Sequence, residues 1–331
     1  MLNAKCVTFS KFGNPRDVLK LENRQIEPPK EHEVLVRMIA RPINPSDLIP
    51  IRGSYAHRIT LPNIPGYEGV GVVEDVGRLV SKGVIGKRVL PLRGEGTWQD
   101  YVKTSANFAV PVPNGIDDAT AAQLYINPVT AWVTCTEILR LTPNDVLIIN
   151  AGGSAIGHIY AQLAKLLGFR LIAVTRNEHY TKGLLSTGAS YVINTSNAPL
   201  YDTVMELTKG AGAYAAIDSV GGIAGEALAS CVQPNGKFLS IGLLSGQQLN
   251  WADLINKGKL DATIFHLRNW NHAVSLSKWH DVFHHLFALV DHNKLRVMDV
   301  QAKFELTEFI SAIDAVEAAE GVKGKVLLMS V

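Results

Sequence analysis

Hydrophobic residues follow one pattern in the first part of the chain and another in the middle. Up to about residue 127 they stand in short runs of strand length, separated by proline and glycine. Such punctuated runs are typical of a barrel-like β domain. The clearest runs cover residues 6–9, 33–39, 69–76, 87–90 and 99–102.

Between about residues 128 and 295, apolar runs of strand length alternate with stretches in which apolar residues recur at helical spacing. This alternation indicates a doubly wound parallel sheet with helices between its strands. The tail returns to β-type runs at 300–304 and 325–328, around a helix expected at 307–320. The pattern therefore predicts an α/β protein. The strand candidates of the middle part are residues 146–150, 171–175, 191–194, 215–219 and 238–241.

Length and charge narrow the class of protein. A chain of 331 residues exceeds what one hydrophobic core usually fills, so two domains are expected. The formal net charge is +2 and no polybasic stripe is present, which argues against nucleic acid or an anionic membrane as the main partner. A small-molecule substrate is the expected partner.

The three cysteines, Cys6, Cys135 and Cys231, are far apart and show no C-x-x-C spacing. They predict neither a disulfide framework nor a thiolate metal site, and they fit a reducing compartment. The first residues show neither an apolar signal segment nor an arginine-rich presequence, and no apolar run has the length of a membrane span. We therefore expect a cytoplasmic protein, with the mitochondrial matrix as the alternative if a presequence has been removed.

A glycine-rich turn follows the strand expected at 146–150 and leads directly into a helix. Residues 152–157 match G-x-G-x-x-G except for serine at the middle position. Small residues let the backbone approach a pyrophosphate, and the N–H groups of the first helical turn attract its negative charge. Gly168 stands where this helix should stop. The expected dinucleotide contacts here are Gly152, Ser154, Ala155, Ile156 and Gly157.

The end of the second strand indicates which dinucleotide is bound. Folds specific for NAD carry a carboxylate there, whereas this chain has Thr175 and Arg176, which suit a 2′-phosphate. NADPH is therefore the predicted cofactor. The alternative rests on Glu178, whose carboxylate would reach a ribose if the strand ended later.

Several short motifs occur in one order along nearly the whole chain. They are I-N-P-S-D at 43–47, G-S-Y at 53–55, P-G-Y-E-G-V-G at 65–71, G-T-W at 96–98, N-P-V-T-A-W at 127–132 and G-K-V at 324–326. Together they resemble the zinc-free branch of the medium-chain dehydrogenase/reductase superfamily, which contains quinone oxidoreductases and, most closely here, 2-enoyl thioester reductases of fatty acid metabolism. The resemblance implies a GroES-like β-barrel catalytic domain formed by residues 1–127 and 296–331. It implies a Rossmann-type NADPH-binding domain at 128–295.

Zinc-dependent members of this superfamily carry a cysteine before the S-D pair and a histidine in G-H-E. Here the first region reads Ile43-Asn44-Pro45, and Tyr67 stands in place of the histidine. Three cysteines also cannot build the four-cysteine lobe of a second zinc. We therefore expect no metal, and hydrogen-bond donors must polarise the substrate carbonyl.

The resemblance implies a reaction and its residues. A hydride from NADPH goes to the β-carbon of a 2-enoyl thioester, and the negative charge that accumulates on the thioester oxygen needs donors. Tyr55 matches the tyrosine that donates to this enolate or protonates the α-carbon. Asn44 resembles the asparagine beside the nicotinamide ribose, although an Asn-Pro pair is also an ordinary turn starter.

Other cofactor contacts are implied by position. Thr130 resembles a residue next to the nicotinamide, although threonine at a helix start is often only a cap. Gly242 and Leu243 follow the last strand predicted for the parallel sheet, at the end where such folds bind ligand. Lys325 is a weaker candidate from the tail.

The predicted substrate pocket departs from the enoyl reductase pattern. Its expected lining is Tyr55, Trp98, Phe265 and His266. His266 replaces a tryptophan of these relatives, and a polar ring there favours short enoyl groups, enones or quinones over long acyl chains.

A group of histidines suggests a metal site only weakly. His280 and His284 are one helical turn apart, but no H-E-x-x-H or cysteine pattern accompanies them, and the flanking residues form an ordinary amphipathic helix. We interpret them as structural or surface histidines.

Two functions besides enoyl thioester reduction stay open. A quinone or enone reductase would share every cofactor residue and differ in the pocket, and an idle NADPH-binding protein would have lost turnover. Relatives pair the edge strands of their cofactor domains, so a homodimer is expected. Residues 238–244 and 248–250 are the predicted edge.

Overall fold

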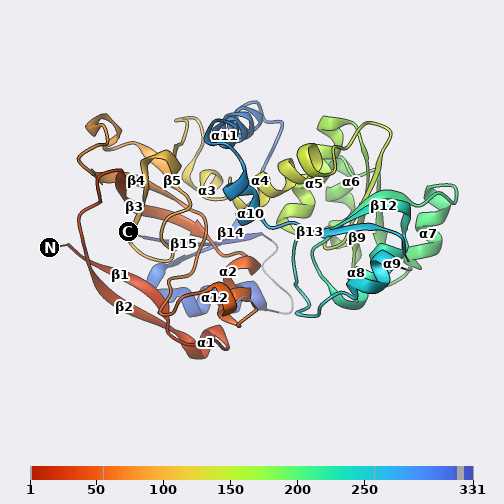
Figure 1. Cartoon of the computed structure of the whole chain (residues 1–331), viewed down its shortest axis with the longest axis horizontal. Coiled ribbons are helices and arrows are strands. Elements are labelled where there is room, and N and C mark those ends of the chain that lie inside the picture. The colour runs from red at the N-terminus through yellow and green to blue at the C-terminus, as the bar shows by residue number, and fades with distance from the viewer. Residues whose placement is uncertain (1, 55, 257, 319–323, 331) are drawn as a thin grey trace. The chain divides into compact units, whose positions relative to one another are not determined.

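The computed structural model describes residues 2–54, 56–256, 258–318 and 324–330. The chain divides into two compact units (Figure 1). The first contains Met1–Ile126, Leu276–Asp291 and Met298–Val331, and the second contains Asn127–Ser275 and His292–Val297. The sequence had placed the whole range 128–295 in one domain, whereas contacts group helix α11 (Leu276–Asp291) with the first unit.

The first unit is built on a mixed sheet to which both chain ends contribute: its strand pairs are antiparallel except for β14 and β15, which pair in parallel. Its order is β14-β15-β3-β4-β5-β7, with β6 also paired to β3, while β1 and β2 form a separate hairpin. The tail enters this sheet where β15 pairs with β3, Leu327 lying opposite Pro42. The strands are β1 (Leu2–Phe9), β2 (Leu19–Ile26), β3 (Glu33–Pro42), β4 (Val70–Val76), β5 (Arg88–Pro91), β6 (Tyr101–Ser105), β7 (Ala109–Pro111), β14 (Val300–Glu305) and β15 (Lys325–Met329).

Helix α2 (Pro45–Ile51) is anchored in a core of the first unit. Ile43, Leu48 and Ile51 pack in one apolar cluster with Trp98 and with residues of β1, β15 and α12 (Phe309–Glu317). Burial of each of these side chains stabilises α2 and the segment that leads into it by about 1.5–3 kcal/mol. The segment around Asn44 is therefore held on a rigid base.

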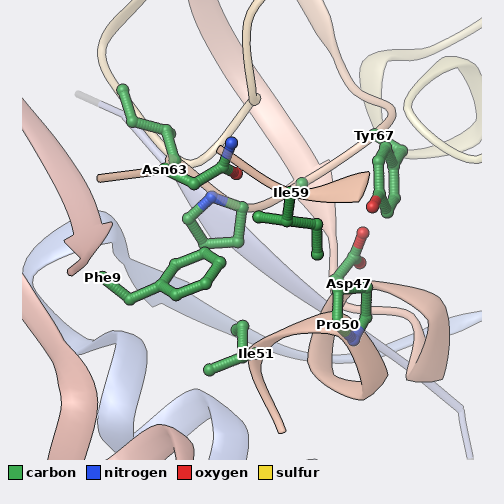
Figure 2. Close-up of a pocket in the computed structure, with 10 residues that line it drawn as sticks. Phe9, Asp47, Pro50, Ile51, Ile59, Asn63 and Tyr67 are labelled. Atoms are coloured by element: carbon green, nitrogen blue, oxygen red, sulfur yellow. The ribbon is translucent and has the colours of Figure 1, made fainter. Parts of the chain in front are cut away.

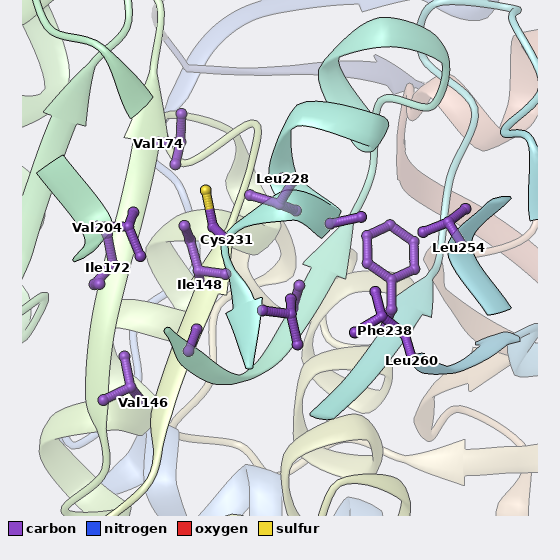
Figure 3. Packing of buried hydrophobic residues seen from close by; sticks show 14 of the residues in the cluster. Val146, Ile148, Ile172, Val174, Val204, Leu228, Cys231, Phe238, Leu254 and Leu260 are labelled. Atoms are coloured by element: carbon purple, nitrogen blue, oxygen red, sulfur yellow. The ribbon is translucent and has the colours of Figure 1, made fainter. Parts of the chain in front are cut away.

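The second unit is a six-stranded parallel sheet. Its order is β10-β9-β8-β11-β12-β13, which is the 3-2-1-4-5-6 order of dinucleotide-binding folds. Ile148, Ile172, Leu228 and Phe238 belong to its main apolar cluster (Figure 3). Because both faces of such a sheet are covered, its central strands are continuous apolar runs, which is why the sequence predicted them. The strands are β8 (Val146–Ile149), β9 (Arg170–Thr175), β10 (Tyr191–Asn194), β11 (Ala213–Asp218), β12 (Val232–Ser240) and β13 (Asp261–Ile264).

The helix predicted after the glycine-rich turn is confirmed as α5 (Ala155–Leu167), and it ends where expected. Gly168 is its C-cap with φ +85°, the left-handed conformation that glycine adopts without strain. The other α-helices not yet given are α1 (Pro15–Val18), α3 (Asp118–Ala121), α4 (Ile126–Val133), α6 (Thr181–Thr187), α7 (Leu200–Leu207), α8 (Gly222–Ser230), α9 (Trp251–Asn256) and α10 (Leu267–Ala273).

The prediction that residues 238–244 and 248–250 form an edge of the parallel sheet is wrong. Residues 238–240 belong to β12, which is hydrogen-bonded to β11 on one side and to β13 on the other. The edges of this sheet are β10 and β13. The sequence analysis missed β13 because most residues of this strand are exposed, so the strand contains no apolar run.

Two further observations concern the helices and the cysteines. Among the described residues, none of the helices combines the length and the apolar character that a membrane span requires. All three cysteines are buried and unpaired, as small core residues.

Candidate functional site

The glycine-rich turn joins β8 to α5. The main-chain N–H of Gly152 donates to the carbonyl oxygen of Val174 at 2.9 Å. Ser154 is the N-cap of α5, and its hydroxyl oxygen accepts the Gly157 N–H at 3.3 Å. A Cβ added to Gly157 would lie 2.2 Å from the carbonyl oxygen of Gly152, so glycine is what lets the turn pack this closely on the helix.

The first turn of α5 presents hydrogen-bond donors for a ligand. Among the described residues, the main-chain N–H groups of Ala155 and Ile156 donate to no protein group. These N–H groups lie at the positive end of the helix dipole, where phosphate oxygens bind favourably. This turn can therefore hold a dinucleotide pyrophosphate.

The residues after β9 favour a 2′-phosphate. The strand ends at Thr175, so Arg176 is the first residue beyond it, and its side chain is exposed. The Glu178 carboxylate is engaged by other protein groups. It accepts hydrogen bonds from Asn194 at 3.0 Å, from Asn197 at 3.0 Å and from Thr181. These hydrogen bonds, that of Asn194 first, lower the pKa of Glu178. The alternative, a ribose held by Glu178, is therefore disfavoured.

Polar residues at the carboxyl ends of β8 and β11 are hydrogen-bonded to each other. The side-chain amide of Asn150 donates to Asp218 at 2.5 Å and accepts the Ser219 N–H at 2.8 Å. Gly242, after β12, packs beside them, because a Cβ there would lie 2.7 Å from the carbonyl oxygen of Ser219. Leu243 follows directly. The sequence analysis missed Asn150 and Asp218 as scaffold residues, although each ends an apolar strand with a polar side chain.

Three more predicted residues lie in the second unit. Thr130 is inside α4 rather than at its start, so the interpretation as a helix cap is wrong. Phe265 is buried, and His266 is the N-cap residue of α10. Their proposed roles beside the nicotinamide and the substrate stay predictions.

In the first unit, four polar residues form a buried cluster around the start of α2, which we call the Asn44 cluster: Asn44, Asp47, Glu68 and Lys325. The Asn44 amide nitrogen donates to Glu68 Oε1 at 2.7 Å, and its amide oxygen accepts from Lys325 Nζ. The main-chain N–H of Asn44 donates to Asp47 Oδ2 at 2.7 Å. The structure thus brings Asn44 and Lys325, 281 positions apart, into contact.

Burial governs the charges of this cluster. It lowers the pKa of Lys325, while the negative charges of Glu68 and Asp47 act in the opposite sense. It raises the pKa of Glu68, against the Lys325 charge and the hydrogen bonds to Glu68. It raises the pKa of Asp47 to about 7, against the hydrogen bond from the Asn44 main chain. The cluster therefore holds one cation beside two carboxyl groups that burial pushes towards protonation.

A small cavity lies beside the cluster, between α2 and the segment 59–67 (Figure 2). Its volume is about 20 Å³, enough for one water molecule and far too small for an acyl chain. Asp47 lines it, and Asp47 Oδ1 has no hydrogen-bond partner among the described residues. A second hollow of about 200 Å³ includes Val146 and Arg170, at the amino ends of the parallel strands. Dinucleotides bind at the opposite ends of such strands.

Two of the predicted pocket residues, Tyr55 and Trp98, belong to the first unit. Tyr55 lies outside the described residues, so its role stays a prediction. Trp98 is fully buried in the apolar core of the first unit, and the structure assigns it a packing role. The sequence analysis missed Glu68 and Asp47 as members of a site, although both stand inside the quoted motifs and a buried acid needs a partner.

His280 and His284 lie on α11, one helical turn apart. Within the part of the chain that the structure describes, no group of three or more histidine, cysteine, aspartate or glutamate side chains could hold a metal ion. The interpretation of His280 and His284 as structural or surface histidines stays a prediction.

Two family models match the chain. Residues 155–278 match the model described as zinc-binding dehydrogenase, and residues 30–114 match the alcohol dehydrogenase GroES-like domain. These matches confirm the predicted fold class, a GroES-like domain with a Rossmann-type domain. They cover the segments that carry α2 and the helix after the glycine-rich turn.

Known proteins of two activities are similar to the chain. A mitochondrial enoyl-acyl-carrier-protein reductase of Xenopus tropicalis is 39% identical over 197 residues, or 58% of this chain and 56% of that protein. The chain thus spans little more than half the length of this curated relative.

Two solved structures match over nearly the full length. One from Bacillus thuringiensis, described as a "putative NADPH:quinone reductase", is 63% identical with a TM-score of 0.98, covering 100% of both chains. The other, Escherichia coli quinone oxidoreductase complexed with NADPH, is 27% identical with a TM-score of 0.90, covering 98% of this chain and 99% of that one.

Proposed function

The chain belongs to the medium-chain dehydrogenase/reductase superfamily, and from this premise we propose that it reduces the C=C bond of a 2-enoyl thioester with NADPH. The coarser assignment, an NADPH-dependent oxidoreductase, follows from the family and from relatives of both activities. Two observations support enoyl thioester reduction in particular. They are the likeness to an enoyl reductase, at 39% identity, and the presence of Tyr55 in the G-S-Y motif.

The second unit fits NADPH. The Ala155 and Ile156 N–H groups supply pyrophosphate donors, and Gly157 leaves the space that a Cβ would fill. Arg176 provides a planar cation for the 2′-phosphate. When bound, NADPH supplies the hydride that is added to the β-carbon of the substrate.

The protein then has to stabilise charge and deliver a proton. Negative charge grows on the thioester oxygen as the β-carbon receives hydride, and a preorganised donor lowers the energy of that state. Tyr55 is proposed to donate its phenolic hydrogen bond to this oxygen and to pass its proton to the α-carbon. Asn44, held in its cluster, is proposed to bind the nicotinamide ribose.

A quinone or enone reductase is the second candidate. The full-length similarity at 63% identity to a structure described as an NADPH:quinone reductase favours it, and so does a histidine, His266, in the expected pocket. Both candidates share the cofactor residues, because the hydride donor is the same.

The experiment that separates the candidates is NADPH oxidation with NADH as control. The acceptors are crotonyl-CoA, a longer enoyl-CoA, 1,4-benzoquinone and 9,10-phenanthrenequinone. The proposal predicts that crotonyl-CoA gives the highest kcat/KM with NADPH, with butyryl-CoA as the product. A kcat/KM at least tenfold higher for quinones would replace it with the second candidate, and NADPH binding without any turnover would indicate an idle protein.

A further inference from the structure

The side-chain amide of Asn44 is held from two sides by groups of opposite charge. Its nitrogen donates to the Glu68 carboxylate at 2.7 Å, and its oxygen accepts from the Lys325 ammonium. The Lys325 charge favours the ionised form of Glu68. A carboxylate can only accept and an ammonium can only donate. The two partners therefore select one of the two orientations that the planar amide could take.

Both partners are themselves fixed by the main chain. Glu68 Oε2 accepts the N–H groups of Tyr125 at 3.2 Å and of Ile126 at 2.8 Å. Lys325 opens β15, and its neighbour Val326 accepts the Ile43 N–H at 3.1 Å, one residue before Asn44. The amide is thus clamped between two side chains whose own positions are set by strand and loop backbone.

A clamp of this kind has an energetic cost. Lys325 is 6% exposed, Glu68 is 1% exposed and Asn44 is 2% exposed, so all three have lost their hydration. Buried ion pairs often contribute little net stability compared with apolar residues of the same volume. Their presence is better explained by the specific arrangement that they impose than by stability.

We propose that Lys325 and Glu68 are positioning residues for NADPH, which act by locking the Asn44 amide in one orientation. This inference rests on the proposed role of Asn44 at the nicotinamide ribose. It departs from the expectation that Lys325 contacts the cofactor itself, because the ammonium is buried and bonded to Asn44.

A double-mutant cycle on NADPH binding tests this coupling. The proteins are wild type, Asn44→Ala, Lys325→Met and the double variant, and the measurement is the NADPH dissociation constant from a fluorescence titration. If Lys325 acts through Asn44, each single change raises the constant about tenfold, and the double change raises it about tenfold as well. A roughly hundredfold rise in the double variant would mean that Lys325 acts independently and would overturn the proposal, as would an unchanged constant in Lys325→Met.

The matched control is Lys103→Met. Lys103 is a largely buried lysine of the same unit, with its side chain 16% exposed, and its ammonium is 4.0 Å from Glu27 rather than in the Asn44 cluster. Its loss should leave the NADPH dissociation constant within about twofold of wild type.

An exchange of the two side-chain types separates positioning from a structural role. In Asn44→Asp combined with Glu68→Gln, the glutamine amide can donate to the new carboxylate, while its oxygen still accepts from Tyr125 and Ile126. Lys325 keeps an acceptor at position 44. We expect thermal unfolding close to wild type but an NADPH dissociation constant raised about tenfold, because the amide is no longer at position 44. Wild-type affinity in this stable variant would show that the cluster is only structural.

Failure of the proposed function would be visible separately. The dissociation constant is measured without any acceptor, so the cycle can be interpreted even if crotonyl-CoA is not reduced. Conversely, the wild type could reduce crotonyl-CoA while the effects of Asn44→Ala and Lys325→Met on NADPH binding were additive. That result would leave the proposed function intact and refute only the positioning role of Lys325.

Discussion

Arg176 is the residue on which the proposed preference for NADPH over NADH rests most directly. It follows β9 immediately, and the competing Glu178 is bonded to Asn194, Asn197 and Thr181. A guanidinium in this place binds a 2′-phosphate through charge-assisted hydrogen bonds.

Replacement of this arginine should change cofactor preference. We expect Arg176→Ala to lower kcat/KM for NADPH about 10–100-fold and to leave kcat/KM for NADH nearly unchanged, because only NADPH has the 2′-phosphate. Arg170→Ala, at the other end of the same strand, is the matched control and should affect neither value. Equal losses with both cofactors in Arg176→Ala would exclude this role.

Asp47 makes a prediction about stability. Burial raises its pKa from 3.8 to about 7. Between these values the folded protein holds a proton that the unfolded chain has released, so the free energy of unfolding falls as the pH rises from about 4 to 7. The slope from this one group is at most about 1.4 kcal/mol per pH unit.

The Asp47→Asn variant removes this titration. Its free energy of unfolding, measured with urea from pH 5 to pH 8, should fall less steeply with pH than that of wild type. Glu68, whose pKa burial also raises, remains in both proteins, so the difference isolates Asp47. Asp17→Asn, at an exposed aspartate, should keep the wild-type slope. Parallel curves for wild type and Asp47→Asn would contradict the raised pKa.

At the scale of single elements, the glycine-rich turn makes the sharpest prediction. In Gly157→Ala, the new Cβ would meet the carbonyl oxygen of Gly152 at 2.2 Å, so the turn has to move away from α5. We expect at least about tenfold weaker NADPH binding.

Gly183→Ala, inside α6, is the matched control. There a Cβ meets only His158 Cε1, at 3.8 Å, and alanine is the better helix former by about 1 kcal/mol. NADPH affinity should be unchanged and thermal stability equal or higher. If Gly157→Ala bound NADPH as tightly as Gly183→Ala, the turn would not be the pyrophosphate site.

Elements were predictable from sequence where burial leaves a local pattern. The central parallel strands β8 and β9 are apolar runs covered on both faces, so they could be predicted almost to the residue. Strands β2 and β13 were missed because most of their residues are exposed, so neither contains a continuous apolar run. The Asn44–Lys325 contact was also out of reach, since no local pattern relates residues 281 positions apart.

At the scale of the whole molecule, both chain ends build the first unit, because β15 of the tail pairs with β3. The sequence implied this only through the family resemblance. The predicted homodimer stays a prediction, and a continuous sheet would require an edge strand such as β13, where Ile264 is 48% exposed, rather than the doubly paired β12. The cytoplasmic compartment likewise stays a prediction.

The central claim, thioester reduction with Tyr55 as the proton donor, is tested most directly by one comparison. NADPH oxidation by crotonyl-CoA is measured with wild type and with Tyr55→Phe, and butyryl-CoA formation is followed by mass spectrometry. We predict butyryl-CoA from the wild type and a loss of about 10²–10⁴-fold in kcat for Tyr55→Phe, with the NADPH dissociation constant unchanged. Absence of butyryl-CoA from the wild type, or an equal kcat in Tyr55→Phe, would contradict the account.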